Sequence, residues 1–253
     1  MENLQRIVVL IDADNTQLAK IEAVMREIST YGRIIVKRAY GNWKKEALKN
    51  WEDELKRLAI KAEQQFDYVV GKNATDMALV ISAVDLLHSG IYDAFVLVAS
   101  DSDYTPLAIK LHESGVYVIG VGEKKTPEAF RNSCDDFIFL ENLTSTASKT
   151  KSIVADEASV QNPSTMKEKH DQIANIDEIH NLLEIAYEKY QDANGFVNVS
   201  SAGTFLKRTK PDFDSRTYGY SKLPDLLAAY SNKYEIKKYR GKGTVNIIAY
   251  KCL

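Results

Sequence analysis

Acidic residues follow the most hydrophobic segments of this chain. Asp12 comes directly after a run of five apolar residues, and Asp101 and Asp103 come just after a second such run. Asp76 opens a segment with helical spacing between them. Open α/β sheets bind ligands beyond the carboxyl ends of their strands, so we expect these carboxylates to converge. Converging carboxylates repel one another unless a hard cation is present, and Mg²⁺ or Mn²⁺ prefers such oxygen ligands. The residue types therefore predict metal-dependent chemistry on phosphates.

Neighbouring polar residues add to this group. Asn15 offers an amide to the same space, and Lys72 lies where it could meet a phosphate. Asp14 is interpreted as a helix cap or a support for the ligands, and Asp85 falls near the opposite face of the helix that Asp76 opens. Each aspartate alone could simply cap a helix, which is a common role for Asp. Three such sites together favour phosphodiester cleavage assisted by bound cations.

Alternating strands and helices must position these residues. We expect strands at 6–12, 34–40, 67–70, 94–99, 116–121 and 137–140, and helices at 18–29, 45–64, 76–89 and 105–114. Short strands rich in Val and Ile, separated by amphipathic helices, indicate a parallel sheet covered on both faces. The fold class of this part is therefore α/β, with the layers of an α/β/α sandwich.

The pattern changes in the second half of the chain. Residues 144–171 are rich in Ser, Thr, Lys, Ala and Asn, which favours a flexible linker. Helices are then expected from Ile176, at 200–207 with a serine cap, and at 222–230, followed by strands at 234–239 and 244–250. Three helices and a terminal hairpin predict a small winged-helix (α+β) domain. The expected domains are 1–143 and 172–253.

Charge is distributed unevenly between these halves. The net charge is only −2, but from Ser200 onward eleven basic and four acidic residues give +7, which leaves −9 for the rest. An acidic half beside a basic half suits a nuclease that carries a separate nucleic-acid-binding module.

Composition also excludes several classes of protein. Two cysteines and four scattered histidines provide neither a disulfide framework nor the spacing of a zinc site. The apolar run before Asp12 is too short for a signal peptide or a membrane span. We therefore expect a cytoplasmic protein.

Three motifs make the first part similar to the NYN family. They are Val9–Asn15, the segment from Lys72 to Leu87, and Ala99–Tyr104, and residues 128–137 fit as well. NYN domains are PIN-like nucleases related to the LabA group. The resemblance covers residues 5–143 and implies a PIN-like parallel-sheet sandwich with Mg²⁺- or Mn²⁺-dependent endoribonuclease activity. By the family pattern, the metal-binding and catalytic residues are Asp12, Asp76, Asp101 and Asp103, with Asn15 in support.

The second part resembles the OST-HTH/LOTUS family through Gly203–Arg208, Pro211–Asp214, Tyr218–Leu223 and Asp225–Leu227. This resemblance implies binding of single-stranded or structured RNA, and in some members a protein partner. The candidate RNA-binding residues of this part are Lys207, Arg208, Lys210, Arg216, Lys222, Arg240 and Lys242. Lys72, Lys124 and Lys125 are further candidates in the first part.

Two other functions remain open at this point. Asp12 and Asp14 also fit the start of a haloacid-dehalogenase-type phosphatase, with Lys110 and the pair Asp135–Asp136 as its remaining residues. Alternatively, the chain is a non-catalytic RNA-binding or scaffold protein. A homodimer is open too. The lysines between 44 and 64 are interpreted as the solvated face of a helix, and Trp43 and Trp51 as packing residues.

Overall fold

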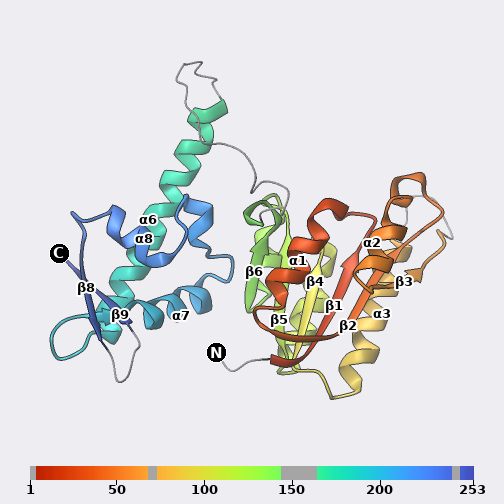
Figure 1. Ribbon diagram of the computed structural model, residues 1–253, viewed down its shortest axis with the longest axis horizontal. Helices are drawn as coiled ribbons and strands as arrows, with labels where there is room; N and C mark the ends of the chain where they lie inside the picture. The colour runs from red at the N-terminus through yellow and green to blue at the C-terminus, as the bar shows by residue number, and fades with distance from the viewer. Residues whose placement is uncertain (1–3, 68–72, 144–163, 241–245) are drawn as a thin grey trace. The chain divides into compact units, whose positions relative to one another are not determined.

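The computed structural model describes residues 4–67, 73–143, 164–240 and 246–253 (Figure 1). The chain divides into two compact units, Met1–Thr150 and Lys151–Leu253. Each unit has its own hydrophobic core. The expected domain boundaries remain a prediction, because residues 144–163 lie outside the described ranges.

A parallel sheet forms the centre of the first unit. Its strands are β1 (Leu4–Asp12), β2 (Gly32–Gly41), β3 (Lys61–Gln64), β4 (Ala94–Val98), β5 (Tyr117–Gly122) and β6 (Asp136–Phe139). They lie in the order β3-β2-β1-β4-β5-β6, and each neighbouring pair is parallel. The chain therefore adds β2 and β3 on one side of β1, and then β5 and β6 on the far side of β4.

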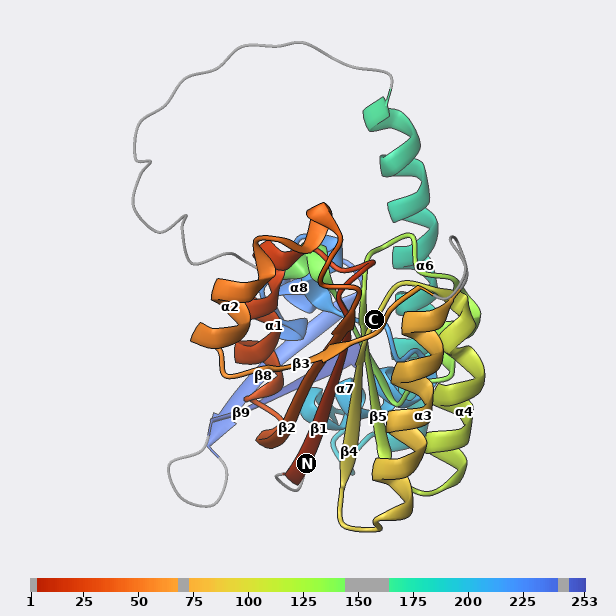
Figure 2. The same cartoon turned by 90° about the vertical axis from the view of Figure 1, so that its right-hand side faces the viewer.

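Helices cover both faces of this sheet. They are α1 (Ile21–Ile28), α2 (Trp51–Arg57), α3 (Ala74–His88), α4 (Thr105–Glu113) and α5 (Glu128–Asn132), with short 3₁₀ turns η1 (Leu18–Lys20), η2 (Glu46–Leu48), η3 (Ser102–Tyr104) and η4 (Leu140–Asn142). Figure 2 shows α1 and α2 on one face and α3 and α4 on the other. The expected α/β/α sandwich is confirmed.

Side-chain alternation along β1 decides which layer each residue faces. Ile7 and Ile11 belong to the core on the α1 and α2 side, whereas Val8 and Leu10 belong to the core with α3 and α4. Asp12 continues the second series, so its side chain faces α3 and α4 at the carboxyl end of the strand. This places a buried carboxylate directly after five buried apolar residues of the strand.

The helix expected over 45–64 is wrong, because α2 ends at Arg57. The amide of Ile60 donates to the carbonyl of Leu55 (2.9 Å) and that of Ala59 donates to Lys56 (3.2 Å), which is the Schellman pattern of a helix end. Ala59 occupies the left-handed position with φ of 50°. Glycine is usual at that position, so the sequence carries no clear signal for the end of this helix.

The third strand also differs from the expectation. The predicted strand at 67–70 lies mostly outside the described residues, and Asp67 itself is not in a strand. The strand β3 instead spans Lys61–Gln64 at the edge of the sheet. Three of its four residues are polar and three are exposed, as is common for edge strands. Such a segment lacks the apolar alternation by which strands are recognised.

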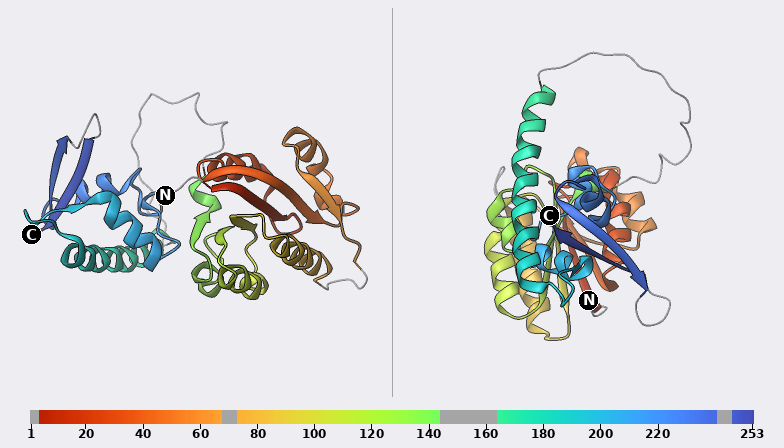
Figure 3. Two further views of the ribbon diagram at one scale, coloured as in Figure 1. Left: turned by 90° about the horizontal axis from the view of Figure 1, so that it is seen from below. Right: turned by 90° about the vertical axis from the view of Figure 1, so that its left-hand side faces the viewer.

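The second unit combines helices with a small sheet (Figure 3). Its elements are α6 (Ser164–Tyr190), β7 (Val197–Asn198), α7 (Val199–Thr209), η6 (Ser215–Tyr218), α8 (Leu223–Ala229), β8 (Tyr234–Arg240) and β9 (Asn246–Cys252). The antiparallel sheet has the order β7-β9-β8. The winged-helix expectation is confirmed. Residues 164–171, expected in the linker, belong to α6, and Asn198 rather than a serine caps α7 by accepting from the amide of Ser200 (2.8 Å).

Candidate active site

The acidic residues meet where the direction of chain winding reverses. β1 and β4 are neighbours, but the chain leaves them toward opposite edges of the sheet. Asp12 is the last residue of β1, and Asp101 lies three residues beyond the end of β4. The hydroxyl of Thr16 donates to the carbonyl of Val98 (3.4 Å), which holds the loop after β1 beside the end of β4. Ligands of open α/β sheets bind at this kind of switch point.

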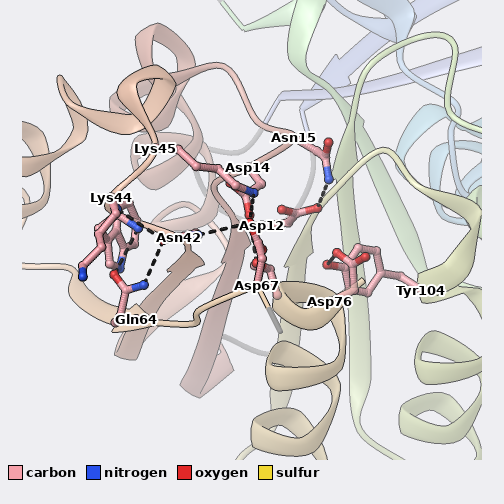
Figure 4. A network of polar contacts seen from close by, with 12 residues as sticks. Asp12, Asp14, Asn15, Asn42, Lys44, Lys45, Gln64, Asp67, Asp76 and Tyr104 are labelled. Carbon is pink, nitrogen blue, oxygen red and sulfur yellow. Dashed lines mark hydrogen bonds and ion pairs between the residues drawn. The ribbon is translucent and has the colours of Figure 1, made fainter. Parts of the chain in front are cut away.

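Asp12 is the most buried of these carboxylates, with an exposed fraction of 0%. Its Oδ2 accepts a hydrogen bond from the Asn15 amide (2.9 Å; Figure 4), whereas its Oδ1 is buried and has no hydrogen-bond partner in the described part of the chain. Burial raises the pKa of Asp12 to about 6, although the Asn15 bond opposes the rise, and the charges of Asp76 and Asp14 raise it further. Burial and two neighbouring carboxylates thus disfavour the charged form of Asp12, which a bound cation would favour.

Asp76 lies in the first turn of α3, close to Tyr104 (Figure 4). The Tyr104 hydroxyl donates to Oδ1 of Asp76 (2.7 Å). Burial raises the pKa of Asp76, and so do the charges of Asp101, Asp103 and Asp14, while the Tyr104 bond lowers it. Burial and the charges of Asp12 and Asp76 raise the pKa of Tyr104, so that its hydroxyl stays protonated and remains a donor.

Asp101 and Asp103 complete the acidic group on the β4 side. Asp101 accepts from the backbone amide of Asp103 (3.0 Å), so it also caps η3, which is the alternative role considered for any of these aspartates. The Asn73 amide donates to Oδ2 of Asp103 (2.9 Å) and connects this loop to the start of α3. Asp103 is exposed and Asp101 is half-buried. Both are therefore accessible to a ligand that enters from solvent.

Asp14 is held by residues on the other side of the group. It accepts from the Thr75 hydroxyl (2.8 Å) and from Lys45 Nζ (3.2 Å), and the same lysine lies 3.5 Å from Oδ2 of Asp67. Burial lowers the pKa of Lys45, but the bonds to the two carboxylates outweigh it and raise the pKa. Both oxygens of Asp14 are thus engaged by the protein, as expected of a supporting residue.

The chemistry of this site fits a hard divalent cation. Its side-chain donors are carboxylate and amide oxygens, one of which is buried and has no partner among the described residues. Burial and then neighbouring negative charge raise the pKa of both Asp12 and Asp76. In the described residues, however, no three His, Cys, Asp or Glu side chains are grouped closely enough to hold a metal ion as they stand. The ligand set of Asp12, Asp76, Asp101 and Asp103 therefore remains a proposal.

Two of the three candidate RNA-binding lysines of the first unit lie in the described part of the chain. Lys124 and Lys125 are exposed on the loop after β5, where Lys125 pairs with Glu123 (2.7 Å). Lys72 lies outside the described residues. Their role in RNA binding stays a prediction.

The basic residues of the second unit differ in their surroundings. Lys210 pairs with Glu178 (3.1 Å), and Arg216 pairs with Asp214 (2.7 Å). Arg208 and Lys222 are exposed, and Lys207 is half-buried near the end of α7. Arg240 ends β8, and Lys242 lies outside the described residues.

Three residues of the site were not identified from the sequence. Tyr104 directly follows the Asp101–Asp103 motif, so its position beside the acidic residues was a usable signal. Lys45 was assigned to a solvated helix face and Asp67 to a strand. Their convergence on the Asp14 side depends on how the segment between β2 and α3 folds, and no local pattern reveals that.

The geometry does not favour the phosphatase alternative. Asp136 begins β6 and Asp135 precedes it, so both lie at the amino end of a strand parallel to β1. Asp12 lies at the opposite, carboxyl end of the sheet. Asp136 is buried and accepts from the Tyr31 hydroxyl, and Asp135 accepts from the amide of Val118 (2.8 Å). This acidic pair has a structural role.

Residues 6–141 match the profile of the NYN domain, and residues 174–246 match that of the OST-HTH/LOTUS domain. No curated protein is significantly similar to the chain. A crystal structure of a protein of unknown function from Vibrio parahaemolyticus is 14% identical, with a TM-score of 0.45, and the match covers 55% of this chain and 94% of that one. An uncharacterized protein from Nitrosomonas europaea, solved by NMR, is 24% identical, with a TM-score of 0.27 and coverage of 44% and 90%. Similarity at this level says nothing about activity.

None of the helices in the described ranges is long and apolar enough to span a membrane.

Proposed function

The chain belongs to the NYN family and carries an OST-HTH/LOTUS domain, and from this premise we propose that it is a metal-dependent endoribonuclease. NYN domains are a PIN-like nuclease family. The observation that supports cleavage most directly is Asp12, a fully buried carboxylate at the switch point of the sheet beside Asp76. One of its oxygens has no partner among the described residues.

The residues of this site have separable tasks. Asp12, Asp76, Asp101 and Asp103 would hold Mg²⁺ or Mn²⁺, which supplies positive charge to the scissile phosphate and acidifies a water molecule. Asn15 fixes the orientation of Asp12, and Tyr104 fixes that of Asp76. Hydrolysis by water would leave a 5′-phosphate and a 3′-hydroxyl, so no side chain needs to act as a nucleophile.

The second unit is proposed to recruit RNA. The excess of basic residues from Ser200 onward provides attraction to phosphates, and the exposed Arg208 and Lys222 would contact them. A protein partner of this unit is the other role that the family implies. Deleting residues 172–253 should weaken binding of long RNA and leave residual cleavage by the first unit.

A cleavage assay tests the nuclease assignment. Labelled single-stranded RNA is incubated with wild type, Asp12→Asn or Asp101→Asn in Mg²⁺, Mn²⁺ or EDTA. We expect cleavage by the wild type with metal, loss in EDTA, and loss in both variants. Asp85→Asn is the matched control, because Asp85 is exposed on the same helix as Asp76. This variant should cleave RNA as the wild type does.

Two results would contradict the proposal. Metal-dependent cleavage that persists in both purified variants would place the active site elsewhere. RNA binding without cleavage under any metal condition would instead favour the non-catalytic RNA-binding or scaffold function.

A further inference from the structure

A cavity of about 550 Å³ opens beside α2 in the first unit. Its apolar lining includes Leu48, Leu55 and Ile60, with Trp43 next to them. Leu55 and Ile60 are the two residues joined by the hydrogen bond that ends α2, so the helix end shapes this cavity. Its volume lies within the usual range of sites for small organic molecules, roughly 300–1,000 Å³.

The charged residues around this apolar lining are mostly lysines. They are Lys44, Lys45, Lys49, Lys56, Glu46 and Glu52, which give a net charge of +2. Lys49 pairs with Glu46 and Lys56 with Glu52, but all four side chains are largely exposed. Exposed ion pairs stabilise a protein little. Both lysines can therefore exchange these partners for an anionic ligand at small cost.

Trp43 presents a fixed aromatic ring to the cavity. Its indole N–H donates to the carbonyl of Glu63 (3.1 Å), and its backbone amide donates to the Gln64 side chain (3.1 Å). Its ring also packs against buried Trp51, with 6.1 Å between the ring centroids. Proteins that bind single-stranded nucleic acids combine an aromatic ring with nearby cations, because bases stack on the ring while phosphates contact the cations. The half-buried ring of Trp43 beside these lysines is such a combination.

The cavity adjoins the acidic site. Lys45 lines the cavity and also contacts Asp14 (Figure 4). Gly41 lies between them: a Cβ atom there would come within 2.8 Å of Leu48 and 3.5 Å of both Trp43 and Ala13. Gly41 thus separates Ala13, the residue after Asp12, from two residues that line the cavity. An RNA strand with one phosphate at the acidic site can therefore place a neighbouring nucleotide in the cavity.

We propose that this cavity binds one nucleotide of single-stranded RNA next to the scissile phosphate, with its base against Trp43 and its phosphate between Lys49 and Lys56. This inference rests on the proposed function, because it takes RNA as the substrate. It assigns a substrate-positioning role to lysines that the sequence presented as a solvated helix face.

Tryptophan fluorescence provides a local test that does not depend on cleavage. Trp43 and Trp51 are the two tryptophans of the chain, so Trp51→Phe leaves Trp43 as the single emitter. The full-length chain with Asp101→Asn, kept in EDTA, is titrated with a short oligoribonucleotide. We expect saturable quenching of Trp43. Lys49→Glu with Lys56→Glu should weaken the affinity read from this quenching about tenfold, whereas Lys110→Glu, exposed on α4, should not.

Buried Trp51 packs in the core, so its replacement could unfold the domain. In that case the chain with both tryptophans is compared with Trp43→Leu, and the RNA-dependent quenching should disappear in the variant. Thermal unfolding of each variant shows whether the domain remains folded.

The outcomes separate this inference from the nuclease proposal. RNA binding detected by anisotropy without any change in Trp43 emission would overturn the nucleotide site, even if wild type cleaves RNA. Equal quenching by poly-glutamate would also overturn it, because the cavity would then recognise acidic peptides. Quenching by RNA in a protein that never cleaves would support the nucleotide site and contradict the nuclease.

Discussion

The carboxylate of Asp12 lies in surroundings that disfavour its charged form. It is fully buried, and one of its oxygens has no partner in the described residues. Burial and nearby carboxylates favour its protonated form, which is why its pKa rises. A protein selected for stability alone would not keep this arrangement, whereas a site that binds a cation gains from it.

Replacing Asp12 by asparagine should stabilise the metal-free protein while it removes cleavage. The folded pKa of Asp12, about 6, lies above the ordinary aspartate pKa of 3.8, so ionisation at pH 7.5 opposes folding. Two pKa units correspond to at most about 3 kcal/mol. Chemical denaturation in EDTA measures this gain, with Asp85→Asn as the control. A lower stability of Asp12→Asn at pH 7.5 would show that the buried charge is compensated by the protein.

Tyr104→Phe should reduce cleavage without abolishing it. The variant removes the hydroxyl that donates to Asp76, so Asp76 would lose a hydrogen bond that lowers its pKa. Losing a partner of a ligand typically costs about 10- to 100-fold in metal affinity or activity. Initial cleavage rates at several Mg²⁺ concentrations measure the effect. Tyr31→Phe is the control, because Tyr31 donates to Asp136 at the other end of the sheet. Unchanged metal dependence in Tyr104→Phe would remove Tyr104 from the site.

At the scale of elements, the segment between β2 and α3 could not be predicted from its pattern. Leu55 and Ile60 are five residues apart, and the sequence suggested one continuous helix. The structure instead ends α2 at Arg57 and turns the chain through Ala59 into a polar edge strand. Apolar periodicity identifies elements that bury a face, so it predicted β1 and β4 and missed β3.

Ala59→Gly should stabilise the first unit by about 1 kcal/mol, because a residue with a Cβ atom in the left-handed region is strained by about that amount. Ala59 has φ of 50°, where glycine fits without this strain. Ala78→Gly inside α3 is the matched control and should lose about 1 kcal/mol. Thermal unfolding measures both. Destabilisation of similar size in the two variants would mean that Ala59 is not strained.

The site residues that follow strands could be predicted from the sequence, whereas those that join the site through tertiary contacts could not. Asp12 and Asp101 follow apolar strands, and their convergence follows from the order of the sheet. Tyr104 and Lys45 reach the same carboxylates through tertiary contacts with Asp76 and Asp14. Such contacts depend on how η3 and the segment after β2 pack. Residue type and spacing do not encode them.

At the scale of the whole molecule, the two units carry opposite charge and separate cores. Apolar residues of the first unit form two clusters around the sheet, and those of the second unit form a third. Each unit therefore has the means to fold cooperatively by itself. The first unit buries Asp12, an acid whose pKa is raised, whereas the second unit buries His180 in α6, a base whose pKa is lowered.

Acidification should shift the unfolding of the two units in opposite directions. Burial lowers the pKa of His180 below 6.5, and the charge of Lys233 adds to this effect. Below about pH 6.5 the unfolded state therefore binds the proton more readily, and the second unit loses stability as the pH falls. Asp12 behaves in the opposite way, because its raised pKa makes the folded state bind the proton more readily between about pH 6 and 4.

Calorimetry of the metal-free chain at pH 7.5 and 5.5 should therefore resolve two unfolding transitions. On acidification the transition temperature of the first unit should rise and that of the second unit should fall. Asp12→Asn should remove the rise that this group causes. His180→Phe should flatten the fall, although it also leaves the Tyr234 hydroxyl without its 2.7 Å partner and lowers the transition at both pH values. For each variant the decisive quantity is the change in transition temperature between the two pH values, because this change reports the titrating group and not the effect of the substitution on packing. A single transition, or the same shift in both variants, would mean that the two cores are not energetically independent.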